Sequence, residues 1–124
     1  MEIVRNGKTA TLLKKMGTKP GLLGWKYLNE AVDLVIEEPM AIDGITKILY
    51  PTIAKKFGTT PTRVERAIRH AIEKSYYGLP LDMVRQIFGN TMAHGDATKP
   101  TNKEFIAAVA QVVAHEPDNP VWSV

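Results

Sequence analysis

The segment GTTPTRVERAIRH, residues 58–70, combines closely spaced cations with an acid and a helical apolar pattern. Its outward polar set is Arg63, Glu65, Arg66, Arg69 and His70. A guanidinium carries a planar fork of donors that fits a phosphate, or the two acceptors on the major-groove edge of guanine. A carboxylate can accept a hydrogen bond from the amino group of cytosine. This set therefore predicts binding to a polyanion, with the donors and acceptors needed to distinguish bases.

Positive charge is concentrated around this segment rather than spread along the chain. From Thr46 to Lys74, seven lysines and arginines stand against two acids, a net charge of +5. All 124 residues together carry +3, so the remainder of the chain carries −2. Such a local excess is typical of a surface that faces phosphates, which orient a bound protein without reporting sequence. The predicted phosphate contacts are Lys47, Lys55, Lys56, Thr60 and Thr62.

The elements that must position these side chains form a predicted helix-turn-helix, in which two helices cross steeply through a short turn. The first helix is expected over residues 51–57 and the second over residues 61–77. Ala54 provides a small residue where the second helix packs over the first. Gly58 tolerates the positive φ that the turn needs. Val64 is the branched apolar side chain that fills the angle between the two helices.

The second helix has its own start signal and a defined inward side. Thr60 is the predicted N-cap, and Pro61 suits the first helical position. At 3.6 residues per turn, several apolar or small residues fall on the same side as Val64. The predicted inward residues are Val64, Ile68, Ala71, Ile72 and Ser75. The cations therefore lie on the opposite side, and the first half of such a helix is the part that reaches base edges.

Two other interpretations of the basic helix compete with base reading. Its charges could simply solvate an exposed face, but the face lacks the Glu-to-Lys pairing typical of such helices. It also belongs to the second helix of the unit, where a groove-reading helix is found. Alternatively, the chain is a helical protein-interaction adaptor whose basic helix docks an acidic partner. A preference for one DNA sequence over another would separate the adaptor from a DNA reader.

The rest of the chain predicts an all-α protein of about six helices. Apolar positions recur at spacings of three and four, without the alternation of strands. The remaining helices are expected over residues 9–16, 22–38, 81–88 and 102–115, with a short segment at 43–49. Asp43 is the predicted N-cap of that short segment, and Pro39 should end the helix before it. Residues 1–124 are predicted to form a single domain with an irregular tail at 116–124.

Several classes of protein are excluded or disfavoured by the composition. Without cysteine there is neither a disulfide framework nor a thiolate metal site. His70, His94 and His115 lack metalloprotease spacing, and no glycine-rich phosphate loop is present. We therefore expect no enzymatic activity, no metal and no cofactor. The apolar runs are too short for a bilayer, and the N-terminus lacks a signal-type stretch, so we expect a soluble cytoplasmic protein without membrane contact.

Three longer runs carry a family resemblance: ITKILYPTIAKKFGTTPTRVERAIRHAIE, LLKKMGTKPGLLGWKYLNEAV and KPTNKEFIAAVA. They are similar to the central part, the opening helices and the last helix of one bacterial domain. This is the C-terminal DNA-binding effector domain of the sporulation-initiation response regulator (stage 0 sporulation protein A) of endospore-forming Firmicutes. The resemblance covers residues 10–112. It implies six helices, the fourth entering the major groove of short boxes resembling TGTCGAA, and activation or repression of sporulation-entry genes.

The resemblance also implies roles for individual residues and partners beyond double-stranded DNA. In RVERAIRH, Arg63, Glu65 and Arg66 would read bases, whereas Arg69 and His70 would contact bases or phosphates. The segment 81–88 matches the region that touches the housekeeping sigma factor of RNA polymerase. The implied contacts there are Leu81, Asp82, Arg85 and Gln86. The last helix matches one used in pairing two copies, a homodimer, on tandem boxes. The family's receiver domain, with its phosphoacceptor aspartate, is not part of this sequence.

Overall fold

The fold is that of a computed structural model, which describes residues 7–19, 21–89 and 99–115. These residues form six α-helices and two short helical segments of other types, with no strand among them. The α-helices are α1 (Lys8–Lys15), α2 (Leu23–Glu37), α3 (Tyr50–Phe57), α4 (Pro61–Tyr76), α5 (Leu81–Phe88) and α6 (Asn102–Ala114). The all-α prediction is confirmed for the described residues. The predicted irregular tail at 116–124 lies outside them.

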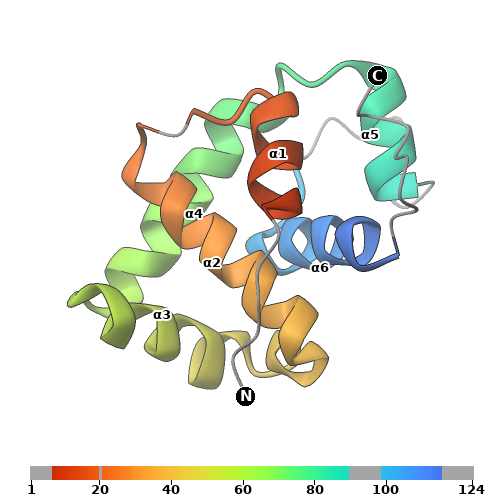
Figure 1. The fold of residues 1–124 in the computed structure, drawn as a ribbon. Coiled ribbons are helices and arrows are strands. Elements are labelled where there is room, and N and C mark those ends of the chain that lie inside the picture. The colour runs from red at the N-terminus through yellow and green to blue at the C-terminus, as the bar shows by residue number, and fades with distance from the viewer. Residues whose placement is uncertain (1–6, 20, 90–98, 116–124) are drawn as a thin grey trace.

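Helix α2 is the central element around which the others are arranged (Figure 1). It packs against α4 on one side and α6 on another, and it also contacts α1 and α3. Apolar side chains from five helices meet in one fully buried cluster, represented by Leu12, Leu28, Ile53, Ile68 and Phe105. Helix α5 contacts this cluster from the far side of the domain from α3 (Figure 1). Helices α3, α4 and α5 therefore share one core.

An aromatic chain fixes α5 to the rest of the core. The rings of Tyr76 and Phe88 meet edge to face with their centroids 5.7 Å apart. Phe88 in turn lies 5.6 Å, centroid to centroid, from Phe105 of α6. Aromatic pairs of this geometry stabilise a fold by about 0.5–1.5 kcal/mol beyond the area that they bury. The short α5 is thus held between the end of α4 and the start of α6.

The two largest helices cross in backbone contact at Gly24. A Cβ atom at this position would lie 2.0 Å from the carbonyl oxygen of Ala67 and 3.0 Å from the Cβ of Ala71. Gly24 is buried, so the contact is part of the interior of the α2–α4 interface. The absence of a side chain therefore sets how closely α2 approaches α4. The sequence signals for helices and turns did not reveal this role.

The segment between α2 and α3 corrects one sequence prediction. Pro39 does end α2, but it starts a 3₁₀ helix, η1 (Pro39–Ile42), which is followed by a π-helical turn, η2 (Ile45–Leu49). The prediction that Asp43 is an N-cap is wrong. Its φ and ψ of −73° and −25° are helical, whereas an N-cap is usually extended, and its N–H donates to the Met40 carbonyl. Asp43 therefore closes η1, and Gly44 precedes η2 without a side-chain cap.

Helix α6 begins as its sequence indicates. The Thr101 hydroxyl accepts from the N–H of Glu104 at 3.1 Å, and the Glu104 carboxylate accepts from the N–H of Thr101 at 2.9 Å. This reciprocal capping box satisfies two backbone donors that the helix itself leaves free. It also fixes the direction from which the chain enters α6. That direction places the next residue, Asn102, against the helix-turn-helix.

Candidate nucleic-acid interface

Helices α3 and α4 form the predicted helix-turn-helix. Gly58 has a left-handed conformation, with φ 65° and ψ 40°, and ends α3. The Thr60 hydroxyl accepts from the N–H of Arg63 at 3.2 Å, which confirms the predicted N-cap of α4. Ala54 is 3% exposed and Val64 is fully buried. The small residue, the turn glycine and the wedge between the helices therefore all occupy the places that their spacing predicted.

The two sides of α4 differ sharply in burial. All of the predicted inward residues are buried, namely Val64, Ile68, Ala71, Ile72 and Ser75. Four predicted site residues are exposed on the other side, namely Arg63, Arg66, Arg69 and His70. Thr60 and Thr62, at the start of the helix, are exposed as well. The structure thus brings the base-reading candidates together on one open surface, with the candidate hydroxyl donors beside them.

Glu65 differs from the other base-reading candidates because its side chain already has a partner within the protein. Its carboxylate lies 3.3 Å from the Arg69 guanidinium, one helical turn later, and its side chain is 33% exposed. The sequence argument considered only Glu-to-Lys pairs on this face, and it overlooked this Glu-to-Arg pair with the same i,i+4 spacing. An ion pair this open contributes about 0–1 kcal/mol, so it can separate at little cost when a base competes for either side chain.

Asn102 joins α6 to both helices of the unit, a link that sequence reasoning missed. Its side-chain amide donates to the Tyr50 hydroxyl at 3.0 Å and to the backbone carbonyl of Glu65 at 3.2 Å. Burial raises the pKa of the Tyr50 hydroxyl, and the hydrogen bond from Asn102 opposes that shift. Because the partners are 52 and 37 residues apart in sequence, no local pattern indicates the contact.

A second link ties the residues before α6 to the outer side of α4. The Lys99 ammonium donates to the Glu73 carboxylate at 2.9 Å. This hydrogen bond holds the pKa of Glu73 below its usual value. Helix α4 is therefore held from its inner side by the core, and along its edge by Asn102 and Lys99. A helix fixed in this way can present its outward side chains without first becoming ordered.

The three lysines predicted to bind phosphate have different surroundings. Lys47 and Lys55 are exposed. Lys56 instead donates to the carboxylate of Glu30 at 2.7 Å, and the Glu30 side chain is only 7% exposed. The Lys56 side chain is itself 51% exposed, so its ammonium lies at the boundary between the core and solvent. Lys56 therefore has a structural contact that Lys55, its neighbour in sequence, lacks among the described residues.

Replacing Lys55 and Lys56 separately by alanine should distinguish a surface charge from a charge that also holds the fold. We expect both substitutions to weaken DNA binding, but only Lys56→Ala to lower the free energy of unfolding. That loss should lie between the ~0–1 kcal/mol of exposed ion pairs and the ~3–5 kcal/mol of buried ones. Urea unfolding followed by circular dichroism measures it. Equal stabilities of the two variants would contradict the structural role of Lys56.

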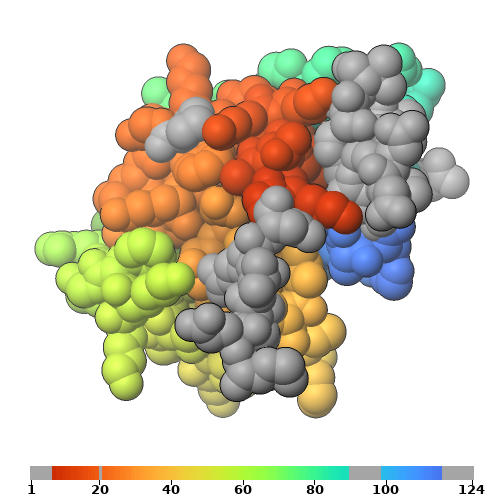
Figure 2. All heavy atoms as spheres, viewed as in Figure 1, coloured from red at the N-terminus to blue at the C-terminus, as the bar shows by residue number. Residues whose placement is uncertain are grey.

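Helix α5 presents the residues predicted to contact the polymerase. Leu81, Asp82, Arg85 and Gln86 are all exposed, and Leu81 is an apolar side chain at 61% exposure. The inward side of the same helix consists of Val84, Ile87 and Phe88, which are buried. Tyr77, just before this helix, is 66% exposed. The outward side of α5 is thus a mixed polar and apolar surface. It is set apart from α3, as both the ribbon (Figure 1) and the space-filling view (Figure 2) show.

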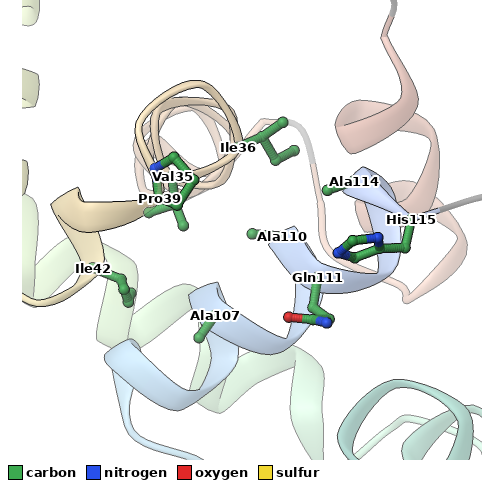
Figure 3. Close-up of a pocket in the computed structure, with 9 residues that line it drawn as sticks. All are labelled: Val35, Ile36, Pro39, Ile42, Ala107, Ala110, Gln111, Ala114 and His115. Carbon is green, nitrogen blue, oxygen red and sulfur yellow. The ribbon is translucent and has the colours of Figure 1, made fainter.

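Other parts of the described structure offer no comparable chemistry. An open hollow of about 200 Å³ lies between the end of α2, η1 and α6, where Gln111 and His115 are its polar lining side chains (Figure 3). A single imidazole beside an amide, among apolar neighbours, does not make an acid–base pair. The described residues include no group of three metal-ligating side chains that could hold an ion. No helix in that part of the chain is long and apolar enough to cross a bilayer.

A comparison with protein families agrees with the geometry of this interface. The chain matches the family model described as sporulation initiation factor Spo0A C terminal over residues 9–113. The match runs from the first turn of α1 to the last turn of α6, so it includes the helix-turn-helix and both links that hold α4. The chain therefore belongs to the family of Spo0A C-terminal effector domains, which are non-catalytic helical domains that bind DNA and regulate the transcription of sporulation genes.

Proposed function

We propose that this domain recognises short boxes resembling TGTCGAA by inserting the first half of α4 into the major groove. Arg63, Glu65 and Arg66 would contact base edges, and Arg69 and His70 would contact bases or phosphates. The flanking phosphate contacts would be Lys47, Lys55, Lys56, Thr60 and Thr62. The observation that carries this proposal is the exposure of the arginines along α4, opposite an inward side that is buried throughout.

The chemistry of the exposed residues suits this division of roles. Arginine can donate two parallel hydrogen bonds to O6 and N7 of guanine, and a box of this kind contains guanine on both strands. Thr60 accepts a hydrogen bond from Arg63 N–H, which leaves its hydroxyl hydrogen available to donate to a phosphate. Lysine is a flexible point charge and suits phosphates better than base edges. Sequence preference should therefore depend on the arginines and on Glu65.

Substituting Arg66 by alanine tests base reading directly. A bidentate contact with guanine contributes about 1–3 kcal/mol of discrimination, so the affinity ratio of box to scrambled duplex should fall roughly five- to 150-fold. Fluorescence anisotropy with both duplexes measures this ratio for the wild type, Arg66→Ala and Lys55→Ala. The lysine variant is the matched control, because loss of a phosphate contact should weaken both duplexes equally.

The same measurements contain the results that would contradict the proposal. If Arg66→Ala weakened binding to both duplexes by the same factor, Arg66 would not be a base-reading residue. If the wild type bound the box and its scramble equally, recognition of the box would be wrong. An adaptor that docks an acidic partner through α4 would then explain the basic helix better.

We also propose that α5 contacts the sigma factor of RNA polymerase and that two copies pair on tandem boxes. The support for the first is the exposed surface formed by Leu81, Asp82, Arg85 and Gln86, away from α3. A combined Leu81→Ala and Arg85→Ala variant should bind the box normally but activate transcription poorly with purified polymerase. Unchanged activation would rule out this surface.

For the pairing of two copies, binding to a duplex that carries two tandem boxes should be cooperative. Independent binding to the two boxes would rule out the homodimer.

A further inference from the structure

A lysine outside the helix-turn-helix lies close to its turn. Lys26 is the fourth residue of α2, two residues after the contact of Gly24 with α4. Its ammonium nitrogen is 4.9 Å from the ring centroid of Phe57 and 5.9 Å from that of Tyr27. Phe57 is the last residue of α3 and directly precedes Gly58 of the turn. The Lys26 charge is thus placed beside the turn that leads into the recognition helix.

The charge of Lys26 is not offset by an acid, unlike several other cations on or beside α3 and α4. Lys56 pairs with Glu30, Arg69 with Glu65 and Lys99 with Glu73. Within the described part of the chain, Lys26 is exposed and has no ion pair with a carboxylate. Its contacts with the two aromatic rings leave its hydrogen-bond donors available. A cation of this kind adds its full charge to the surface around the turn.

The aromatic residues below Lys26 also restrict where its ammonium can go. Tyr27 and Phe57 pack with their ring centroids 5.4 Å apart, and Lys26 extends over the Phe57 ring. The negative face of an aromatic ring attracts a cation, so positions of the ammonium above the Phe57 ring are favoured. A lysine that is held before binding loses less conformational entropy when it contacts a phosphate. The two rings therefore hold the positive charge of Lys26 in one region beside the turn.

We propose that Lys26 is a phosphate-binding residue that extends the DNA interface from the helix-turn-helix onto α2. The ligand is the DNA backbone next to the turn, on the side where α2 approaches α4 and α3 (Figure 1). This inference rests on DNA binding by α4 and adds one contact to it. Because Gly24 fixes the approach of α2 to α4, the position of Lys26 relative to the recognition helix is set by backbone packing.

The salt dependence of binding distinguishes a phosphate contact from simple packing of the lysine stem on Phe57. Lys26→Met keeps the length and the apolar stem but removes the charge. Each phosphate neutralised contributes about 0.9 to the slope of log affinity against log salt concentration, so the slope should flatten by about that amount. Affinity should fall by the same factor for the box and its scramble. Lys26→Arg should restore the slope, because it restores the charge.

Lys15→Met is the matched control, since Lys15 is an exposed lysine on α1, which packs on α2 and α6. Its slope should equal that of the wild type. If Lys26→Met left the slope unchanged while the wild type still preferred the box, the Lys26 contact would be overturned and DNA reading by α4 would stand. A lower melting temperature with an unchanged slope would also overturn it, because only packing would then be lost. A wild type without salt-dependent DNA binding would overturn both proposals together.

Discussion

Gly24→Ala should lower the free energy of unfolding by about 3 kcal/mol or more and reduce DNA binding in proportion to the unfolded fraction. The added Cβ would lie 2.0 Å from the Ala67 carbonyl oxygen and 2.7 Å from its carbon. Both are backbone atoms within α4, so neither can rotate away as the end of a side chain could. The two helices would have to separate, which exposes the interface on both of them.

The matched control for this substitution is another glycine replaced by alanine. A Cβ at Gly78 would meet one backbone oxygen, that of Ser75, at an ordinary contact distance of 3.7 Å. Gly78→Ala should therefore change stability by less than about 1 kcal/mol. Urea unfolding of both variants, followed by circular dichroism, gives the comparison. If the two variants were equally stable, close packing at Gly24 would not be what sets the α2–α4 interface.

Val64→Asp should unfold the domain under conditions in which the wild type is folded. Val64 is fully buried in the angle between α3 and α4. The substitution removes about 1.5–3 kcal/mol of apolar burial and adds the cost of a buried carboxylate, which is several kcal/mol without a partner. The sum approaches the whole stability of a typical small domain, about 5–15 kcal/mol. Loss of helical circular dichroism and of a cooperative melting transition would report the unfolding.

The same carboxylate at an exposed position of α4 provides the control. Thr62 is exposed in the first turn, where a negative charge interacts favourably with the N-terminal end of the helix dipole. Thr62→Asp should therefore leave stability unchanged or raise it slightly, although it should weaken binding to DNA. A Val64→Asp variant that melted like Thr62→Asp would show that Val64 does not hold the two helices together.

The helix-turn-helix could be predicted from sequence because each of its requirements is local. Gly58 supplies a left-handed turn, Thr60 caps the helix that follows, and Val64 falls on the inward side by helical periodicity. The same rules predicted the bounds of α5 and the first residue of α6. They failed at Asp43 because the 3₁₀ helix that starts at Pro39 ends at this residue, so Asp43 is helical and does not cap the next segment.

The contacts that hold the site in place could not be predicted, because they join residues distant in sequence. Glu30 and Lys56 are 26 residues apart, and Asn102 and Tyr50 are 52 apart. Lys26 was not among the predicted phosphate contacts, since nothing local connects α2 with the turn after Phe57. The exposed cations of α4 were found because one helix carries them all. Their support comes from three other helices, α2, α3 and α6.

The bond from Asn102 to α4 has a consequence for how this domain could diverge. Asn102 donates to the backbone carbonyl of Glu65, an acceptor that every residue type supplies at that position. The link is therefore insensitive to which side chain stands at position 65, one of the proposed base contacts. Substitutions of exposed residues usually change the free energy of unfolding by less than about 0.5 kcal/mol. Arg63 and Arg66 are both exposed, so this range applies to them. The outward side chains of α4 can thus change while the contacts that hold this helix stay the same. Under the proposed base reading, new promoter preferences can therefore arise, or be engineered, without loss of the fold.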